Sequence, residues 1–513
     1  MKQKYFYKTL HLVAFIGILN LIGCTDKWDE HYDPSSMELS NQTLTEYING
    51  RQDLSSFAEL LKVSGYDSIL NLPQSYTVWV PTNEGMENVD LNNAEEVMKV
   101  VKNHIAKSKL TTTTQESKPV FMLNGKYVDF SRESNGYTFG NSGLVEVNIP
   151  ASNGLVHVVD NSVEYLDNIW EYIQNTEGLD SLKKYIFSKD TMVFDPINSQ
   201  LIGYNNDNQP VYDTVEVYGN PFLTYLGSMN VEDSVYTAIL PDNNAWIEAY
   251  DRITKYLNIP TSAGGEEQQH ELTQRLIIND MVFRGDDDNY AAMDSIITTS
   301  ENVYYEPYKL FEGLMPTEVS NGLVYNASQM PFSDTASFFK EIRVEAEYST
   351  YRDNANSDLN VQTSYGSGLE VSNNRYVEVI STSTSSSSPS NVAFQIPNTL
   401  SAKYNIYCVF VPHTITNKDN LVASQVKFRL TYIYSDSGRT RRKTITPVNN
   451  TTNISDTTKM LVAPIEFEFA DIMDEDQENP IVKLEVISDV FNEEEGLTPN
   501  MRIDCIILEP VID

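Results

Sequence analysis

Cysteine and histidine side chains commonly act as nucleophiles or general bases and bind transition metals. The cysteines are Cys24, Cys408 and Cys505, and no spacing among them resembles a zinc site. The six histidines are scattered, and none has a partner at the spacing of metal ligands. The sequence also lacks a glycine-rich phosphate loop, an HExxH motif and a GxSxG nucleophile elbow. We therefore expect a protein that is not an enzyme. The enzymatic alternative requires an active site that no motif reveals.

Cys24 ends a segment with the features of an export signal. The first eight residues are basic, residues 10–22 are apolar, and Gly23 precedes the cysteine. The apolar run is too short for a comfortable membrane span. The segment LIGC at 21–24 resembles the lipobox of bacterial lipoproteins, in which the chain is cleaved before the cysteine and the thiol is acylated. The alternative is an ordinary signal peptide with an incidental cysteine.

This resemblance implies a signal peptide at 1–23, a lipidated tether at 24–39 and a lipid anchor such as palmitate on Cys24. After Cys24 the tether reads TDKWDEHYD, which resembles the acidic signal that sends some lipoproteins to the outer face of the outer membrane. We therefore expect an outer-membrane protein that faces the cell exterior.

The length and the net charge of the chain limit the number of domains and the kinds of partner that we expect. A chain of 513 residues is too long for one hydrophobic core and predicts two to four domains. The formal net charge of -36 argues against nucleic acid as a partner, because binding the phosphate backbone needs a cationic surface.

An internal repeat occupies the first two thirds of the chain. Residues 75–86 read SYTVWVPTNEGM and residues 235–246 read VYTAILPDNNAW, each a β-type run followed by proline and an Asx-containing turn. Each copy later closes on Ser-Asn-Gly-Leu-Val, at 152–156 and at 320–324. Asn-Gly predicts a tight turn into a strand.

The repeat resembles the fasciclin (FAS1) domain. The first copy matches that family's pattern at Val80–Glu84, at 101–105, which includes His104, and at 153–160. The second copy has Leu276–Met281, without a histidine, at the middle motif, and it carries a long insertion around 186–220. The resemblance implies two mixed α/β domains, at 40–167 and 168–335, that act in adhesion or interaction. His104 lies in an apolar helical pattern, so a packed or capping histidine is favoured over a catalytic one.

From about residue 340 the apolar residues alternate, which predicts at least eight short strands in an antiparallel β-sandwich, jelly-roll-like, over 340–513. The segments EAE at 345–347 and RIDCIILEP at 502–510 resemble the galactose-binding-like sandwich of carbohydrate-binding modules. That resemblance implies a structural Ca²⁺ held by Glu345, Glu347 and Asp504. The alternative is that these are ordinary solvent-facing strand acids.

Cys408 and Cys505 lie in two apolar strands of this region. An exported protein could join them in a disulfide, but two buried free thiols are favoured, because cysteine is often simply buried.

These features together predict a cell-surface binding lipoprotein. Our leading hypothesis is an accessory subunit that captures a glycan or peptide for a Sus-type outer-membrane nutrient importer. The alternative is an adhesin that binds host matrix or neighbouring cells through its FAS1-like domains. The sequence does not identify the ligand-binding residues.

Overall fold

The computed structural model describes residues 41–512, except residues 73, 88, 91–92, 113–116, 134–135, 206, 287–288, 356, 367, 383–384, 386, 474–479 and 495. Cys24, the export signal and the tether lie outside the described residues. The chain divides into two compact units, Met1–Asp167 and Asn168–Asp513, and both are rich in strands. In the part that the structure describes, no helix has both the length and the apolar character needed to cross a membrane.

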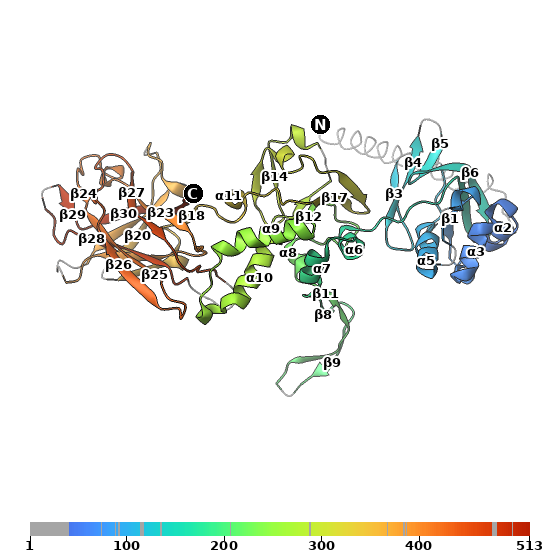
Figure 1. Ribbon diagram of the computed structural model, residues 1–513, viewed down its shortest axis with the longest axis horizontal. Helices are drawn as coiled ribbons and strands as arrows, with labels where there is room; N and C mark the ends of the chain where they lie inside the picture. The colour runs from blue at the N-terminus through green and yellow to red at the C-terminus, as the bar shows by residue number, and fades with distance from the viewer. Residues whose placement is uncertain are drawn as a thin grey trace, which may run out of the picture. The chain divides into compact units, whose positions relative to one another are not determined.

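The first unit is built on a seven-stranded sheet with the order β2-β1-β7-β6-β5-β4-β3 (Figure 1). Its strands are β1 (Tyr76–Pro81), β2 (Ile105–Ala106), β3 (Lys118–Phe121), β4 (Tyr127–Glu133), β5 (Gly136–Phe139), β6 (Ser142–Ala151) and β7 (Gly154–Val159). Its described helices are α2 (Leu44–Asn49), α3 (Ser55–Val63), α4 (Tyr66–Ile69) and α5 (Ala94–Asn103). The β1–β7 pairing is parallel and the other pairings are antiparallel. The mixed α/β fold predicted for this region is therefore present.

Helices pack on the central strands of this sheet because their apolar residues recur at helical spacing. Every residue of β1 and β7 is buried. Phe57 and Leu61 of α3 belong to the same buried hydrophobic cluster as Val78 and Val80 of β1. One hydrophobic cluster of the first unit therefore lies between its helices and the β1–β7 pair, and a second, which includes Trp79 and Phe139, lies among its strands.

The second unit begins with a four-stranded sheet of order β13-β12-β17-β16. Its strands are β12 (Tyr236–Pro241), β13 (Val282–Arg284), β16 (Pro316–Val319) and β17 (Gly322–Ala327), and β14 (Ser295–Ile297) pairs with β15 (Val303–Tyr305). Its helices are α6 (Ile169–Asn175), α7 (Asp180–Phe187), α8 (Phe222–Tyr225), α9 (Asn243–Ile253), α10 (Gly265–Ile278) and α11 (Asp334–Ser337). The insertion between α7 and α8 forms β8 (Thr191–Phe194), β9 (Gln200–Tyr204), β10 (Pro210–Asp213) and β11 (Glu216–Gly219).

This four-stranded sheet repeats the central pairing of the first unit. β12 pairs in parallel with β17 from Tyr236–Gly322 onwards, as β1 pairs with β7 from Tyr76–Gly154 onwards. β13 pairs with β12 and β2 pairs with β1, both antiparallel. The two copies therefore share a register as well as a sequence pattern.

The asparagine of the Asn-Gly segment makes equivalent hydrogen bonds in both copies. The side chain of Asn153 accepts from the Leu44 N–H (2.9 Å) and donates to the Leu70 carbonyl (2.5 Å). The side chain of Asn321 accepts from the Ile169 N–H (2.9 Å) and donates to the Met229 carbonyl (2.8 Å). In each copy one amide thus ties the start of the first helix to the loop before the central strand.

The rest of the second unit consists of two main antiparallel sheets and a short parallel pair. The first sheet contains β20-β21-β30-β23-β27, with β18 also paired to β30, and the second has the order β19-β22-β28-β25-β26. Their strands are β18 (Ile342–Glu345), β19 (Arg352–Ala355), β20 (Ser357–Thr363), β21 (Arg375–Ser381), β22 (Asn391–Gln395), β23 (Lys403–Phe410), β25 (Val426–Ile433), β26 (Thr440–Ile445), β27 (Thr458–Glu466), β28 (Lys483–Ser488) and β30 (Met501–Pro510); the pair is β24 (Ala423–Ser424) and β29 (Leu497–Thr498).

The two main sheets share a hydrophobic core. Phe410 of the first sheet contacts Phe428 of the second, with ring centroids 6.4 Å apart. Both belong to one buried cluster with Phe394 and Ile503. Buried and less buried residues alternate along β23, because one face of the strand packs in this core and the other face does not.

Short 3-10 helices connect many of these elements, at Gln52–Leu54, Glu84–Met86, Thr254–Tyr256, Thr261–Ala263, Tyr290–Ala292, Pro307–Lys309, Ser349–Tyr351, Ser372–Asn374 and His413–Ile415.

Candidate metal centre

The candidate metal centre lies where two strands meet the same side of β30. β23 pairs along one side of β30, whereas β18 and β21 share the other side end to end. β18 pairs with residues 505–508 and β21 with residues 501–503, so Asp504 falls at the junction. The Ala346 N–H donates to the Asp504 carbonyl (2.9 Å). Strand pairing therefore brings the EAE segment to the last strand of the chain.

This junction gathers the acids to which the resemblance to carbohydrate-binding modules assigned calcium. Carboxylate oxygens of Glu345 and Asp504 and the sulfur of Cys505 all lie within 4.8 Å of one another. Asp504 is only 4% exposed and Glu347 only 8% exposed. The acids thus sit in a buried cluster, which we call the acidic cluster (Glu345, Glu347 and Asp504).

The turn at 372–374 holds all three acids by hydrogen bonds. The Ser372 N–H donates to both carboxylate oxygens of Asp504 (3.0 and 3.3 Å), and its hydroxyl donates to Glu345 (2.6 Å). The side-chain amide of Asn373 donates to Glu347 (3.2 Å). Asn373 has a φ of 50°, a left-handed conformation that asparagine adopts more readily than most residues. Sequence reasoning missed this turn, although the run Ser-Asn-Asn before β21 is a typical turn signal.

The acidic cluster carries more negative charge than its neighbours neutralise. Burial, which has the largest effect, together with the charges of Glu345 and Glu347, raises the pKa of Asp504 to about 7, although the Ser372 N–H acts in the opposite direction. One carboxylate oxygen each of Glu345 and Glu347 is buried without a hydrogen-bond partner among the described residues. Arg343 and Arg352 offset some of the charge, but Arg343 is already paired with Glu341 (2.9 Å) and Arg352 donates a hydrogen bond to the Ala346 carbonyl. A buried carboxylate without compensation is unfavourable, so the cluster is suited to a cation.

The donor atoms favour a hard cation over a transition metal. Calcium binds six to eight oxygens in flexible geometry, and the acidic cluster offers carboxylate oxygens. Zinc in proteins favours thiolate and imidazole ligands, and Cys505 is the one such group among the candidate ligands here. The residues present therefore fit Ca²⁺ and do not fit a thiolate site.

Cys408 and Cys505 are both buried and both free. Burial raises the pKa of each thiol, which keeps both protonated and unreactive. The prediction of two buried thiols is confirmed.

The two histidines of the fasciclin-like motifs are packed and neutral. The ring of His104 contacts the Val100 carbonyl (2.8 Å) through Nδ1 and accepts from the Val163 N–H (3.0 Å) through Nε2. The ring of His157 contacts the Leu110 carbonyl (2.9 Å) and accepts from the Asn148 N–H (3.3 Å). Burial lowers the pKa of each to about 4. The interpretation of His104 as a packed residue is confirmed.

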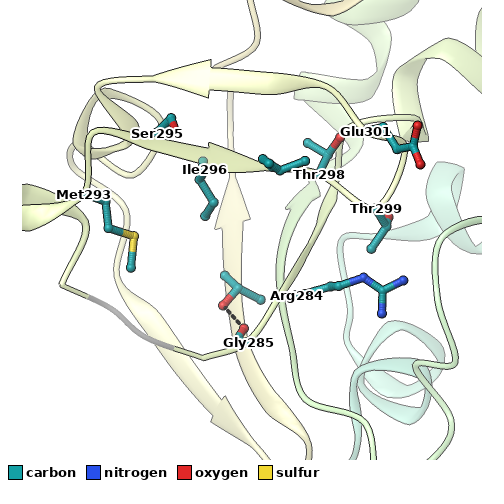
Figure 2. A pocket seen from close by; sticks show the side chains of 10 residues that line it. Arg284, Gly285, Met293, Ser295, Ile296, Thr298, Thr299 and Glu301 are labelled. Atoms are coloured by element: carbon teal, nitrogen blue, oxygen red, sulfur yellow. Dashed lines mark hydrogen bonds between the residues drawn. The ribbon is translucent and has the colours of Figure 1, made fainter.

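A further cavity lies in the second unit, in a region where no motif predicted a site. It has a volume of about 480 Å³ beneath the β14–β15 hairpin. Figure 2 shows Arg284 extending toward the side of the cavity where Thr299 and Glu301 lie, and it shows the hydrogen bond from the Thr237 hydroxyl to the Gly285 carbonyl (2.8 Å). The lining mixes apolar and hydroxyl side chains with one cation, Arg284, and one acid, Glu301, a combination that alone does not define a ligand.

Two solved structures show partial likeness to this chain. A FAS1 domain pair from the insect cell adhesion molecule fasciclin I aligns at 12% identity and a TM-score of 0.22, covering 56% of this chain and 98% of that chain. The CBM22-1–GH10 modules of Clostridium thermocellum endo-1,4-β-D-xylanase 10B, complexed with xylohexaose, align at 14% identity and a TM-score of 0.23, covering 34% of this chain and 28% of that chain. We draw no function from likenesses at TM-scores this low.

A comparison with curated proteins finds no match. The scan against protein families matches residues 52–164 to the fasciclin domain. The matched residues span β1 to β7, with the parallel pair and the packed histidines described above. Fasciclin domains are typically adhesion domains and not enzymes. This chain therefore contains a fasciclin (FAS1) domain at residues 52–164, within a larger multidomain, β-rich protein.

Proposed function

We propose that this chain is a cell-surface binding protein, anchored by an acyl group on Cys24, in which fasciclin-type domains carry a ligand-binding β-sandwich. The fasciclin domain at 52–164 is the observation on which this proposal chiefly rests, because that domain is associated with adhesion. The lipobox-like segment at 21–24 supports the anchor.

A second fasciclin-type domain follows the first in this proposal, over about 168–335. It is supported by the shared register of the two parallel pairs and by the equivalent roles of Asn153 and Asn321. Asn83 and Asn243 match in the same way, since their side-chain oxygens accept from the N–H groups of Ser56 and Ser181. Two such domains would set the sandwich apart from the membrane.

The sandwich would bind Ca²⁺ through Glu345, Glu347 and Asp504. A bound divalent cation supplies positive charge to the cluster and joins strand ends that are distant in sequence. The three acids in turn hold the 372–374 turn in place, because Ser372 and Asn373 donate hydrogen bonds to them. This role of the cation is structural.

The ligand that we favour is a glycan, with a peptide as the alternative. Tyr348 directly follows Glu347, and Tyr365 precedes the 372–374 turn; both side chains are exposed, Tyr365 to 87%. An exposed tyrosine ring offers an apolar face and a polar tip, a combination suited to the face of a sugar ring. In this setting the protein would act as an accessory subunit of a Sus-type importer. Adhesion to matrix or to neighbouring cells is the second candidate, and the fasciclin domain favours it.

The test compares glycan and matrix binding by the purified lipoprotein in detergent with Ca²⁺. Tyr365→Ala is the test variant, and Tyr305→Ala is its matched control, because Tyr305 is 77% exposed on another sheet. Glycan binding lost in the first variant and kept in the second is the expected result. Matrix binding unaffected by both variants would establish the adhesion alternative instead. Binding to neither the glycans nor the matrix would contradict the proposal.

A further inference from the structure

The insertion at 191–219 is a β-ribbon with almost no packing of its own. β8 pairs with β11 and β9 with β10, in two separate two-stranded antiparallel sheets. Figure 1 shows β9 at the far end of this ribbon, which extends away from α7. Among its described residues, Asp195 is the only one that is buried. The ribbon therefore contributes little to the core of its own unit.

The ribbon exposes an unusual amount of apolar surface. Its exposed large hydrophobic residues are Met192, Val193, Phe194, Ile197, Leu201, Ile202, Tyr204, Val211, Tyr212, Val215, Val217 and Tyr218. Consecutive strand residues such as Met192 and Val193 point to opposite faces, so both faces are apolar. Large exposed apolar surfaces on soluble proteins usually mark binding sites, and a two-stranded ribbon alone is marginally stable in water. Both facts indicate a surface that is covered in the functional state.

Internal contacts hold the ribbon in a defined shape. At its base, the Tyr218 hydroxyl donates to Asp190 (2.6 Å), and the Asn220 amide donates to the Ile186 carbonyl (2.8 Å). At its tip, the side-chain oxygen of Asn205 accepts from the Gln209 N–H (2.8 Å). A binding element that is already ordered loses less conformational entropy when it docks.

The charge of the ribbon favours some binding partners over others. Residues 191–219 contain no lysine or arginine and have four acids, of which Asp195 is buried and Asp207, Asp213 and Glu216 are exposed. A second copy of this chain would bring like charges together, and the whole chain carries -36. An anionic lipid surface would repel the ribbon for the same reason. An apolar groove with lysine or arginine at its rim would satisfy both the apolar faces and the acids.

We propose that residues 191–219 form a docking arm that inserts into an apolar, basic-rimmed groove of a second protein. Each of its sheets has two strands among the described residues, so its outer edges are places to which a strand of the partner could add. The docking arm does not depend on the identity of the ligand in the sandwich, and glycan binding does not depend on the docking arm. Failure of one proposal therefore leaves the other standing.

The first experiment places the photo-crosslinking residue p-benzoylphenylalanine at position 202 or 204 of the full lipoprotein in cells that make it naturally. Positions 305 and 365, exposed tyrosines on other elements, are the controls. The expected result is one adduct with a different protein, formed from 202 and 204 and absent from 305 and 365. An adduct that contains only peptides of this chain, adducts with lipid alone, or no adduct would overturn the proposal.

The second experiment measures binding of the purified adduct partner. Ile202→Ser should weaken binding about tenfold or more, because it removes an apolar anchor. Asp213→Lys and Glu216→Lys should also weaken it, and added salt should reduce the difference between these variants and the wild type. Unchanged affinity in Ile202→Ser, or tighter binding by the lysine variants, would contradict the groove that we propose.

A shortened arm separates docking from folding. Replacing residues 194–216 by Asn-Gly keeps the β8–β11 pairs nearest the base and supplies a two-residue hairpin turn. The thermal midpoint should stay close to that of the wild type, while partner binding is lost. A large fall in the midpoint would show that the ribbon packs on its own unit, and would overturn the proposal.

Discussion

Glu345 and Asp504 come from the first and last strands of the C-terminal region, yet their carboxylate oxygens lie within 4.8 Å of each other. They meet because β18 and β21 leave Asp504 at the junction between them on one side of β30. The contact is buried, so it must be balanced by a proton or by a cation. From this relationship we expect the C-terminal region to respond to divalent cations.

Calcium should raise the thermal unfolding midpoint of the protein prepared in a chelator. A ligand that binds only the folded state at a hundred times its Kd adds about 2.7 kcal/mol of stability. The double variant Glu345→Gln, Asp504→Asn should lose this response. Glu370→Gln is the control, because Glu370 is an exposed acid close to the same turn. An equal calcium response in the double variant would show that the cation binds elsewhere.

The first unit should lose stability as the pH falls from about 6.5 toward 4. Burial lowers the pKa of His104 and His157 to about 4, so below the ordinary value of 6.5 the unfolded chain binds protons that the folded chain does not. Stability is therefore full above 6.5 and declines toward 4, by up to roughly 3 kcal/mol for each histidine. Hydrogen exchange of peptides from 41–167 at pH 7 and pH 5 measures the change.

His104→Gln should flatten this pH dependence, although it also lowers stability at pH 7. His270→Gln serves as its control, since His270 is exposed in the other unit. Equal protection of the backbone amides against hydrogen exchange at both pH values in the wild type would contradict the prediction.

Gly154→Ala and Gly322→Ala should destabilise their respective domains. A Cβ at Gly154 would lie 2.2 Å from the Tyr76 carbonyl oxygen, and one at Gly322 would lie 1.8 Å from the Tyr236 carbonyl oxygen. The parallel strands would have to separate, at a cost of about 3 kcal/mol or more. Gly203→Ala, where a Cβ meets nothing within 4 Å, should have little effect on the thermal midpoint.

Cys408 and Cys505 should not react with a thiol reagent in the native protein. Both are buried and their raised pKa values keep them protonated. After unfolding in guanidinium without a reductant, both thiols should titrate. A disulfide would yield no thiol under these conditions, which makes the count decisive.

Local patterns in the chain were enough to predict several elements. The run before Pro81 and the run before Pro241 predicted strands, and the Asn-Gly segments predicted turns into strands; both are present in both copies. The apolar surroundings of His104 likewise indicated a packed ring. Periodicity and turn chemistry involve residues close in sequence, so they can be read directly from it.

Contacts between distant segments could not be inferred in this way. The resemblance named Glu345, Glu347 and Asp504, but Ser372 and Asn373 join them only through the pairing of β18 and β21 with β30. The insertion around 186–220 was evident in the sequence, whereas its exposure on both faces was not. Strand order and burial depend on which segments pair across the whole fold, and apolar residues alternate in the same way in an exposed ribbon and in a core strand.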